Sequence, residues 1–265
     1  MKDTTTQKIL IKVGTSTLTH SNGKINLQRV ECLSKVLSEL QNKGNKVILV
    51  SSGAVGVGVG KLRLKERPKD TKTKQAAAAV GQCELMFIYD KFFGEYNHTI
   101  AQILLTRRTI ENAITRENVK NTANTLLDMD VIPIVNENDT VAVDELEGEN
   151  FGDNDMLSAI VAKILEVDKL IILTDIDGLY DKNPSTNSDA KLISRVDKIT
   201  EEIEQMAGAS ASNRGTGGMN TKVMAAKLAT QANIETIILN GQDPHILYDY
   251  FNGEEVGTTF NCDNK

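Results

Sequence analysis

Short apolar runs and longer amphipathic segments alternate along most of the chain. The first apolar run, Lys8–Val13, is rich in β-branched residues and stops at Gly14, a pattern typical of a buried strand. Strands are predicted at Lys8–Val13, Lys46–Val50, Ile100–Leu105, Val131–Val135, Lys169–Thr174 and Glu235–Leu239. Val131–Val135 is the least regular run, because Pro133 lacks the N–H that a strand donates to its neighbour.

The segments between the strands carry apolar residues three and four positions apart, the spacing of a helix with one buried face. Helices are predicted at Leu27–Lys43, Lys72–Glu95, Arg116–Met129, Asp155–Leu165, Ile199–Met206, Met219–Ala232 and Pro244–Phe251. The turn-rich segment from Asp175 to Asp197 is compatible with a hairpin. This alternation predicts an α/β protein, with a mainly parallel sheet between two layers of helices. We expect one domain, with a break near Asn138 to Phe151 that separates two lobes.

The composition of the chain excludes several classes of protein. The 30 basic and 36 acidic residues give a net charge of −6, and 40% of residues are hydrophobic, as in an ordinary globular chain. The acidic balance argues against nucleic-acid binding. The three cysteines, Cys32, Cys83 and Cys262, are too few and too scattered for a disulfide framework or a zinc site. Because the sequence has neither a membrane-length apolar run nor a signal peptide, we expect a cytoplasmic protein without a membrane partner.

Polar clusters follow the predicted strands, where ligands bind in parallel sheets. One of them, Ser51-Ser-Gly-Ala54, precedes a predicted helix whose N–H groups would face a carboxylate or phosphate. A tight turn with serine as the helix cap explains the same spacing equally well. The glycines from Gly53 to Gly60 do not complete a dinucleotide fingerprint, and a Walker phosphate loop is absent from the sequence.

Two lysines lie next to glycines. The segment Gly215-Thr-Gly-Gly-Met-Asn-Thr-Lys222 opens a predicted helix, and its glycines allow the backbone to approach phosphate oxygens. The alternative is a flexible loop before a solvated helix. Lys12 interrupts an otherwise apolar strand just before Gly14. In a central strand its ammonium group needs a counter-ion or the end of the sheet, whereas in an edge strand it would lie in water.

Acidic and amide residues gather after the fourth predicted strand. Asn136-Glu-Asn-Asp139 and Gly152-Asp-Asn-Asp155 suit an ammonium-bearing substrate, a lysine or Mg²⁺, although such residues are also common in turns. Together with the two lysines, these clusters favour an anionic, phosphorylated ligand.

In this arrangement the chain resembles the amino acid kinase family, and within it the branch that phosphorylates the side-chain carboxylate of L-glutamate in the first step of proline biosynthesis. The motifs span nearly the whole chain in family order. They are Lys12-Val-Gly-Thr-Ser16, Val50-Ser-Ser-Gly-Ala54, Lys74–Gln82, Leu104-Leu-Thr-Arg107, Pro133–Asp139, Gly152–Asp155, Leu173–Tyr180 and Gly215–Lys222. The resemblance implies ATP as phosphoryl donor, with glutamate in an N-terminal lobe (about 1–155) and ATP in a C-terminal lobe (about 156–265).

The resemblance also implies residue roles. Lys12 and Lys222 would stabilise the transferred phosphoryl group, and Asp155 would hold both lysines. The implied glutamate-binding residues are Ser52, Gly53, Ala54, Asn136, Asp139 and Asn154. The implied ATP-binding residues are Lys12, Gly14, Thr174, Asp175, Thr216, Gly217, Gly218, Met219, Asn220, Thr221 and Lys222. Mg²⁺ is expected with ATP, held mainly by the nucleotide, and feedback inhibition by proline and a homo-oligomer (dimer or tetramer) are expected as well.

Many members of this branch continue into a PUA domain of roughly a hundred residues, and a sequence that stops at Lys265 has no room for one, so a short form is expected. Two alternatives stay open. A related kinase for acetylglutamate, carbamate, aspartate or uridylate would differ at Asn136 to Asp139, where the acceptor is read. A catalytically idle nucleotide sensor would not need Lys12, Asp155 and Lys222 together.

Overall fold

The computed structural model describes residues 6–20, 24–142, 154–209 and 218–262. Within these ranges eight strands form one sheet in the order β3-β4-β2-β1-β5-β7-β8-β6. The strands are β1 (Lys8–Val13), β2 (Lys46–Val50), β3 (Ile100–Leu105), β4 (Ile132–Glu137), β5 (Lys169–Thr174), β6 (Arg195–Val196), β7 (Glu235–Asn240) and β8 (Thr258–Phe260). The first five strands in that order and β7 run parallel, so their carboxyl ends share one edge; β8 runs antiparallel to β7.

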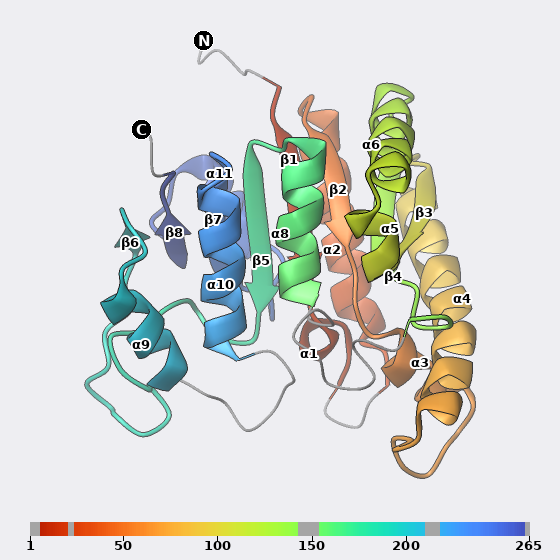
Figure 1. Ribbon diagram of the computed structural model, residues 1–265, viewed down its shortest axis with the longest axis horizontal. Coiled ribbons are helices and arrows are strands. Elements are labelled where there is room, and N and C mark those ends of the chain that lie inside the picture. Colours follow the sequence, from red (N-terminus) through yellow and green to blue (C-terminus); the bar gives the residue numbers. More distant parts are fainter. Residues whose placement is uncertain (1–5, 21–23, 143–153, 210–217, 263–265) are drawn as a thin grey trace.

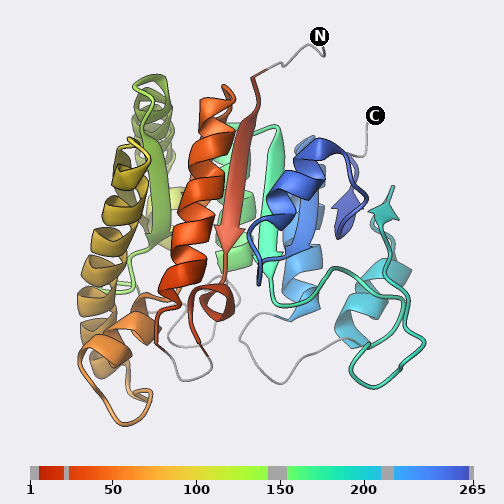
Figure 2. The same ribbon diagram turned by 180° about the vertical axis from the view of Figure 1, so that it is seen from behind.

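Helices cover both faces of this sheet. They are α1 (Thr15–Leu18), α2 (Leu27–Asn42), α3 (Ala54–Lys61), α4 (Thr71–Glu95), α5 (Arg107–Glu111), α6 (Ala113–Asp128), α8 (Asn154–Leu165), α9 (Glu201–Ala209), α10 (Met219–Thr230) and α11 (Ile246–Asn252). Helices α6, α8 and α10 lie on the face shown in Figure 1, and α2, α4 and α11 on the opposite face shown in Figure 2. The predicted three-layer α/β/α sandwich is confirmed. Among the described helices, none is both long and apolar enough to cross a membrane.

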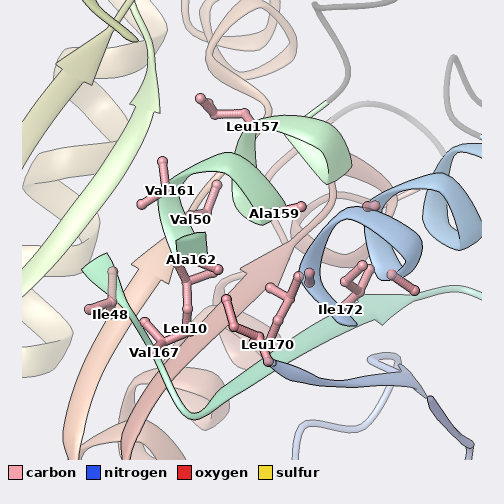
Figure 3. Packing of buried hydrophobic residues seen from close by; sticks show 14 of the residues in the cluster. Leu10, Ile48, Val50, Leu157, Ala159, Val161, Ala162, Val167, Leu170 and Ile172 are labelled. Atoms are coloured by element: carbon pink, nitrogen blue, oxygen red, sulfur yellow. The ribbon is translucent and has the colours of Figure 1, made fainter. Parts of the chain in front are cut away.

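Alternation of side chains along β1 divides the core into two clusters. Leu10 packs on one face with residues of α8 and α10, whereas Ile9 and Ile11 pack on the other with residues of α2 and α4. Figure 3 shows Leu10 beside Ala162 on the α8 side. Because successive strand residues point to opposite faces, Lys12 lies on the same face as Leu10, toward α8. This period-two alternation therefore selects the helix from which the counter-ion of Lys12 comes.

The six predicted strands are confirmed, with small changes at their ends. The Pro133-containing strand is β4, which lies inside the sheet between β3 and β2. Its register with β2 covers only Ile134 and Val135, after the proline, so that neighbour needs no N–H from Pro133. Asn136 and Glu137, which we expected after this strand, are its last two residues.

Several short elements were not predicted from the sequence. The strands β6 and β8 have two and three residues, and the helices α1 and α5 have four and five. Segments of this length contain too few positions for a hydrophobic period to be detected. The expected hairpin after β5 appears only as an isolated antiparallel bridge between Tyr180 and Leu192.

Candidate functional site

Two lysines meet one carboxylate at the carboxyl edge of the sheet. Lys12 Nζ lies 2.5 Å from Asp155 Oδ1, and Lys222 Nζ lies 3.0 Å from Asp155 Oδ2. The lysine side chains are 7% and 8% exposed, and that of Asp155 is fully buried. β1 is central, between β2 and β5, so the edge-strand alternative for Lys12 is wrong. The structure brings together the three residues for which a role in phosphoryl transfer was predicted.

The charge state of Asp155 follows from this arrangement. Burial alone would raise its pKa, but the charges of Lys12 and Lys222 and their hydrogen bonds outweigh burial and lower the pKa to about 2. Asp155 is therefore ionised at neutral pH. One negative and two positive groups leave the cluster with a net positive charge, which suits an anionic ligand.

Helix α10 positions the second lysine. Gly218 is its N-cap, Met219 is buried and Asn220 is exposed at its start, and Lys222 follows one turn from the cap. Thr221 Oγ1 donates a hydrogen bond to Asp155 Oδ2 (3.1 Å), so this predicted ATP-binding residue also ties α10 to Asp155. Thr216 and Gly217, predicted as nucleotide contacts, lie outside the described residues.

The turn after β1 carries Gly14 beside the first lysine. A Cβ atom placed on Gly14 would lie 3.5 Å from Lys12 Nζ, so the bare backbone of this residue borders the ammonium group. Gly14 is the N-cap of α1, and Arg29 at the start of α2 donates from Nη1 to the carbonyl oxygen of Thr17 (2.9 Å) in that helix. Sequence reasoning missed Arg29, because a single arginine in the first turn of a predicted helix has no distinguishing pattern.

A second turn, after β2, brings the predicted carboxylate-binding residues to the same edge. Asn154 Nδ2 donates to Ser52 Oγ (2.7 Å), and Ser52 is buried. Gly53 adopts a left-handed conformation (φ 93°) that favours glycine, and the next residue, Ala54, begins α3. Within the part of the chain that the structure describes, the buried Asn154 Oδ1 has no hydrogen-bond partner, so an acceptor is left for a ligand.

Close contact between α3 and α4 supports this turn. A Cβ atom on Gly81 would lie 1.8 Å from the carbonyl oxygen of Ala54, and one on Gly58 would lie 1.8 Å from that of Ala77. The two helices therefore touch backbone to backbone, which only glycine permits at these positions. This packing sets the direction in which the first N–H groups of α3 point.

The end of β4 supplies the third polar group. Asn136 Nδ2 donates to Gln82 Oε1 (2.8 Å), and the Asn136 Oδ1 atom accepts from the Glu137 backbone N–H (2.9 Å). The buried Asp139 lines a small pocket together with Ala54 and Gln82. Gln82 was not assigned a role from the sequence. Its signal was a polar residue on the buried face of α4, between Ala78 and Leu85.

The remaining predicted nucleotide residues lie at the end of β5. Thr174 is buried, and its carbonyl oxygen accepts from the Gly241 backbone N–H (2.7 Å) after β7. Asp175 is exposed. Thr174 Oγ1 donates to Asp175 Oδ1 (3.3 Å), and among the described residues neither side chain hydrogen-bonds to the lysine cluster at this edge.

The sequence of this chain is similar to those of known proteins over most of its length. A family model described as "Amino acid kinase family" matches residues 7–240. A protein of Clostridium perfringens named "Glutamate 5-kinase" is 57% identical over 255 residues, which are 96% of this chain and 95% of the relative. Proteins of the same name from Listeria innocua and Lactococcus lactis subsp. cremoris are 55% and 47% identical over 96% of this chain, and these matches span 92% and 94% of the relatives.

Solved structures agree on the fold. Carbamate kinase from Giardia lamblia bound to AMP-PNP superimposes with a TM-score of 0.68 at 17% identity, over 97% of this chain and 98% of that one. UMP kinase from Bacillus anthracis superimposes with a TM-score of 0.63 at 16% identity, over 98% and 97% of the two chains. At such identities the likeness concerns the architecture alone.

Proposed function

The chain belongs to the amino acid kinase family, and from this premise we propose that it transfers the γ-phosphoryl group of ATP to the side-chain carboxylate of L-glutamate. The product is L-glutamyl 5-phosphate, the first intermediate in proline biosynthesis from glutamate. Relatives that are 47–57% identical over 96% of the chain carry the name glutamate 5-kinase. The observation that carries the proposal is the pair of buried lysines on Asp155, at the carboxyl edge of the sheet.

The reaction needs positive charge more than it needs a base. A glutamate side chain with a pKa of about 4.3 is already ionised at neutral pH, so no proton has to be removed before attack. One carboxylate oxygen forms a bond to the γ-phosphorus, the bond from that phosphorus to the β,γ-bridging oxygen breaks, and ADP leaves with the electron pair. Charge spreads over the transferring oxygens, and preorganised cations stabilise it.

In this proposal Lys12 and Lys222 supply those cations and Asp155 acts as a positioning residue. Both oxygens of Asp155 are bonded to lysine ammonium groups, so the carboxylate orients the two cations without contacting substrate. Because both lysine side chains are buried, dissolved ions screen their charges little. The lysines are held in place before the substrates arrive, and reorganisation during the reaction is small.

Glutamate would lie between α3 and the end of β4. A carboxylate of the bound glutamate would face the backbone N–H groups of Gly53 and Ala54, at the start of α3, and the hydroxyl of Ser52. Asp139 is suited to the α-ammonium group, with Asn136 and the Oδ1 acceptor of Asn154 in support. All of these residues belong to the N-terminal lobe or to its boundary near residue 155.

ATP would bind over the C-terminal lobe, at the start of α10 and the ends of β1 and β5. Gly14 and the segment Thr216–Lys222 would contact its phosphates, with Thr174 and Asp175 nearby. Both Asp155 oxygens are engaged by lysines, which fits an ion held mainly by phosphate oxygens rather than by this carboxylate. Mg²⁺ bound with ATP would supply charge neutralisation on the phosphates.

Two further properties belong to the proposal. Proline shares the α-carboxylate and a positively charged α-nitrogen with glutamate, and would therefore occupy the same amino-acid pocket without offering an acceptor oxygen. A homo-oligomer is expected from the family, and Phe87, which is 66% exposed on α4, is one apolar side chain that a second copy could cover.

An acceptor survey tests the function. The purified chain is incubated with ATP, Mg²⁺ and hydroxylamine, with glutamate, acetylglutamate, aspartate or carbamate as acceptor, and acyl phosphate is trapped as hydroxamate. Hydroxamate should form mainly with glutamate, and Lys222→Ala should abolish most of it. Preference for another acceptor would identify a different member of the family, and ATP binding without turnover would identify a nucleotide sensor.

A further inference from the structure

A cysteine from the start of the chain meets an aspartate and a histidine from near its end, on the face covered by α2 and α11 (Figure 2). Cys32 Sγ, in α2, lies 3.6 Å from each ring nitrogen of His245, the N-cap of α11, although the two residues are 213 positions apart. His245 Nδ1 lies 2.8 Å from Asp243 Oδ1. One donor atom from each of the three side chains lies within 4.8 Å of the other two.

The separation between Cys32 Sγ and the His245 ring nitrogens matches that of a tetrahedral zinc site. With ordinary zinc–ligand distances, a thiolate sulfur and an imidazole nitrogen lie about 3.6 Å apart around the ion. We propose that Cys32, His245 and Asp243 bind one thiophilic divalent cation, Zn²⁺ or an ion of similar preference, with solvent as the fourth ligand. This site shares no residue with the kinase centre, and it does not depend on the function proposed above.

The binding step requires the side chains to move. Because Cys32 Sγ is equally far from both ring nitrogens, the imidazole must turn until one nitrogen points at an ion held by the sulfur. His245 Nδ1 and Asp243 Oδ1 now form a hydrogen bond, and both would ligate the ion after separating to about 3.4 Å. Asp243 Oδ1 also accepts from the His245 backbone N–H (3.0 Å), which keeps the carboxylate beside the ring. The side chains of His245 and Asp243 are 55% and 74% exposed, so an ion can reach the site and the side chains can adjust.

The proton balance of this step is simple. The Cys32 Sγ–H bond breaks, a sulfur–metal bond forms, and the proton is released to the buffer. The His245 imidazole would bind the ion through Nδ1 and carry its one proton on Nε2, as a metal-bound imidazole does. Asp243 is ionised already, because its hydrogen bond from the His245 backbone N–H lowers its pKa. Binding therefore releases one proton per ion and involves no oxidation or reduction.

Metal binding explains the cluster better than a reactive thiol does. Burial and the nearby Asp243 carboxylate raise the pKa of Cys32, so the free thiol is a poor nucleophile at neutral pH. The same carboxylate that disfavours a thiolate favours a cation.

Such an ion would connect two segments that come from opposite ends of the chain. Cys32 belongs to α2, whose residue Arg29 holds the helix after β1, and His245 follows the Gly241 turn after β7. A Cβ atom on Gly241 would lie 3.1 Å from Thr17 Cγ2, so this turn already lies against α1. The ion would therefore cross-link α2 to the turn after β7 and stabilise the folded chain.

Cobalt titration tests the site, because a thiolate–Co²⁺ bond produces a charge-transfer band in the near ultraviolet. The full chain is freed of metal and nucleotide and titrated with Co²⁺, and the ion is then displaced with Zn²⁺. Thermal unfolding is measured with and without Zn²⁺. The variants are Cys32→Ser, His245→Gln and Asp243→Asn. Cys83→Ser is the matched control, since it removes an exposed cysteine on α4 far from this cluster in sequence.

We expect the band to saturate at one Co²⁺ per chain, and Zn²⁺ to raise Tm. Cys32→Ser should lose both the band and the Tm shift. The two other variants should weaken binding by at least about 10-fold, because loss of an outer-shell partner alone costs about 10–100-fold. Cys83→Ser should behave like the parent chain. The absence of a band in the parent chain, a band that survives Cys32→Ser, or undiminished binding in His245→Gln would each overturn the proposal.

Discussion

Replacing Asp155 with asparagine tests the arrangement at the centre of the kinase site. The amide has nearly the same shape as the carboxylate but no charge, so Lys12 and Lys222 keep their space and lose their shared counter-ion. We expect the Asp155→Asn variant to fold with reduced stability and to lose most of its turnover. Its KM for glutamate should change little, because Asp155 contacts the lysines rather than the amino acid.

The size of the stability loss can be worked from two sides. The pKa of Asp155 falls from 3.8 to about 2 on folding, a change that corresponds to about 2 kcal/mol. Removal of one partner from a buried ion pair costs about 3–5 kcal/mol. The expected loss is therefore about 2–5 kcal/mol, less than the whole stability of most domains. For kcat we expect a fall of about 100-fold, similar to the loss of one charge-stabilising donor.

The same pKa shift predicts a pH dependence of stability. Because the folded-state pKa of Asp155 is depressed, its contribution is fully present above about pH 3.8. The contribution is lost as the pH falls through 3.8 toward about 2, where the folded protein also takes up the proton. The difference in unfolding free energy between the parent chain and Asp155→Asn should therefore become smaller as the pH falls through that range.

Urea unfolding at neutral and acidic pH, together with steady-state kinetics at saturating ATP, measures these effects. Glu202→Gln is the matched control, because it makes the same acid-to-amide change at the exposed first turn of α9. A charge at the N-terminus of a helix contributes up to about 1 kcal/mol. If Asp155→Asn cost no more stability than Glu202→Gln and kept its kcat, Asp155 would be only a favourable helix-start residue and the reasoning would be refuted.

Three further predictions concern the lysines, the α3–α4 contact and the amino-acid pocket. Lys222→Ala should raise the barrier that sets kcat by about 3 kcal/mol, with little change in the KM for glutamate. The double variant with Lys12→Ala should lose less than the sum of the two single effects. An unchanged kcat would exclude a role of Lys222 in stabilising the transferring phosphoryl group. Gly81→Ala should destabilise the chain by about 3 kcal/mol in urea unfolding, because its Cβ atom would lie 1.8 Å from a backbone oxygen. Gly94→Ala is the control: nothing lies within 4 Å of its Cβ atom, so it should be neutral or stabilising. Equal effects of the two substitutions would contradict the contact. Proline should raise the apparent KM for glutamate and leave that for ATP nearly unchanged, and Asp139→Ala should weaken glutamate binding and proline inhibition together; inhibition competitive with ATP would rule out a shared pocket.

Local patterns in the sequence were sufficient for six of the eight described strands and for most of the helices. A strand such as Lys8–Val13 or a helix such as Leu27–Asn42 is recognised from neighbouring residues, because backbone conformation and the period of buried positions repeat within a few residues. The same reasoning placed polar residues at the carboxyl ends of the strands, where the candidate site lies. The roles of individual site residues came from family resemblance and stay predictions.

Contacts between distant residues were decided only by the tertiary structure. The sequence left Lys12 either in water or beside a counter-ion, and the strand order that places β1 inside the sheet selected the second. Gln82 and Asn136 are 54 positions apart, and they meet because α4 packs beside the end of β4. Cys32 and His245, 213 positions apart, share no ligand spacing along the chain. Such pairs depend on strand order and helix packing, which arise from the burial of the whole core rather than from any local pattern.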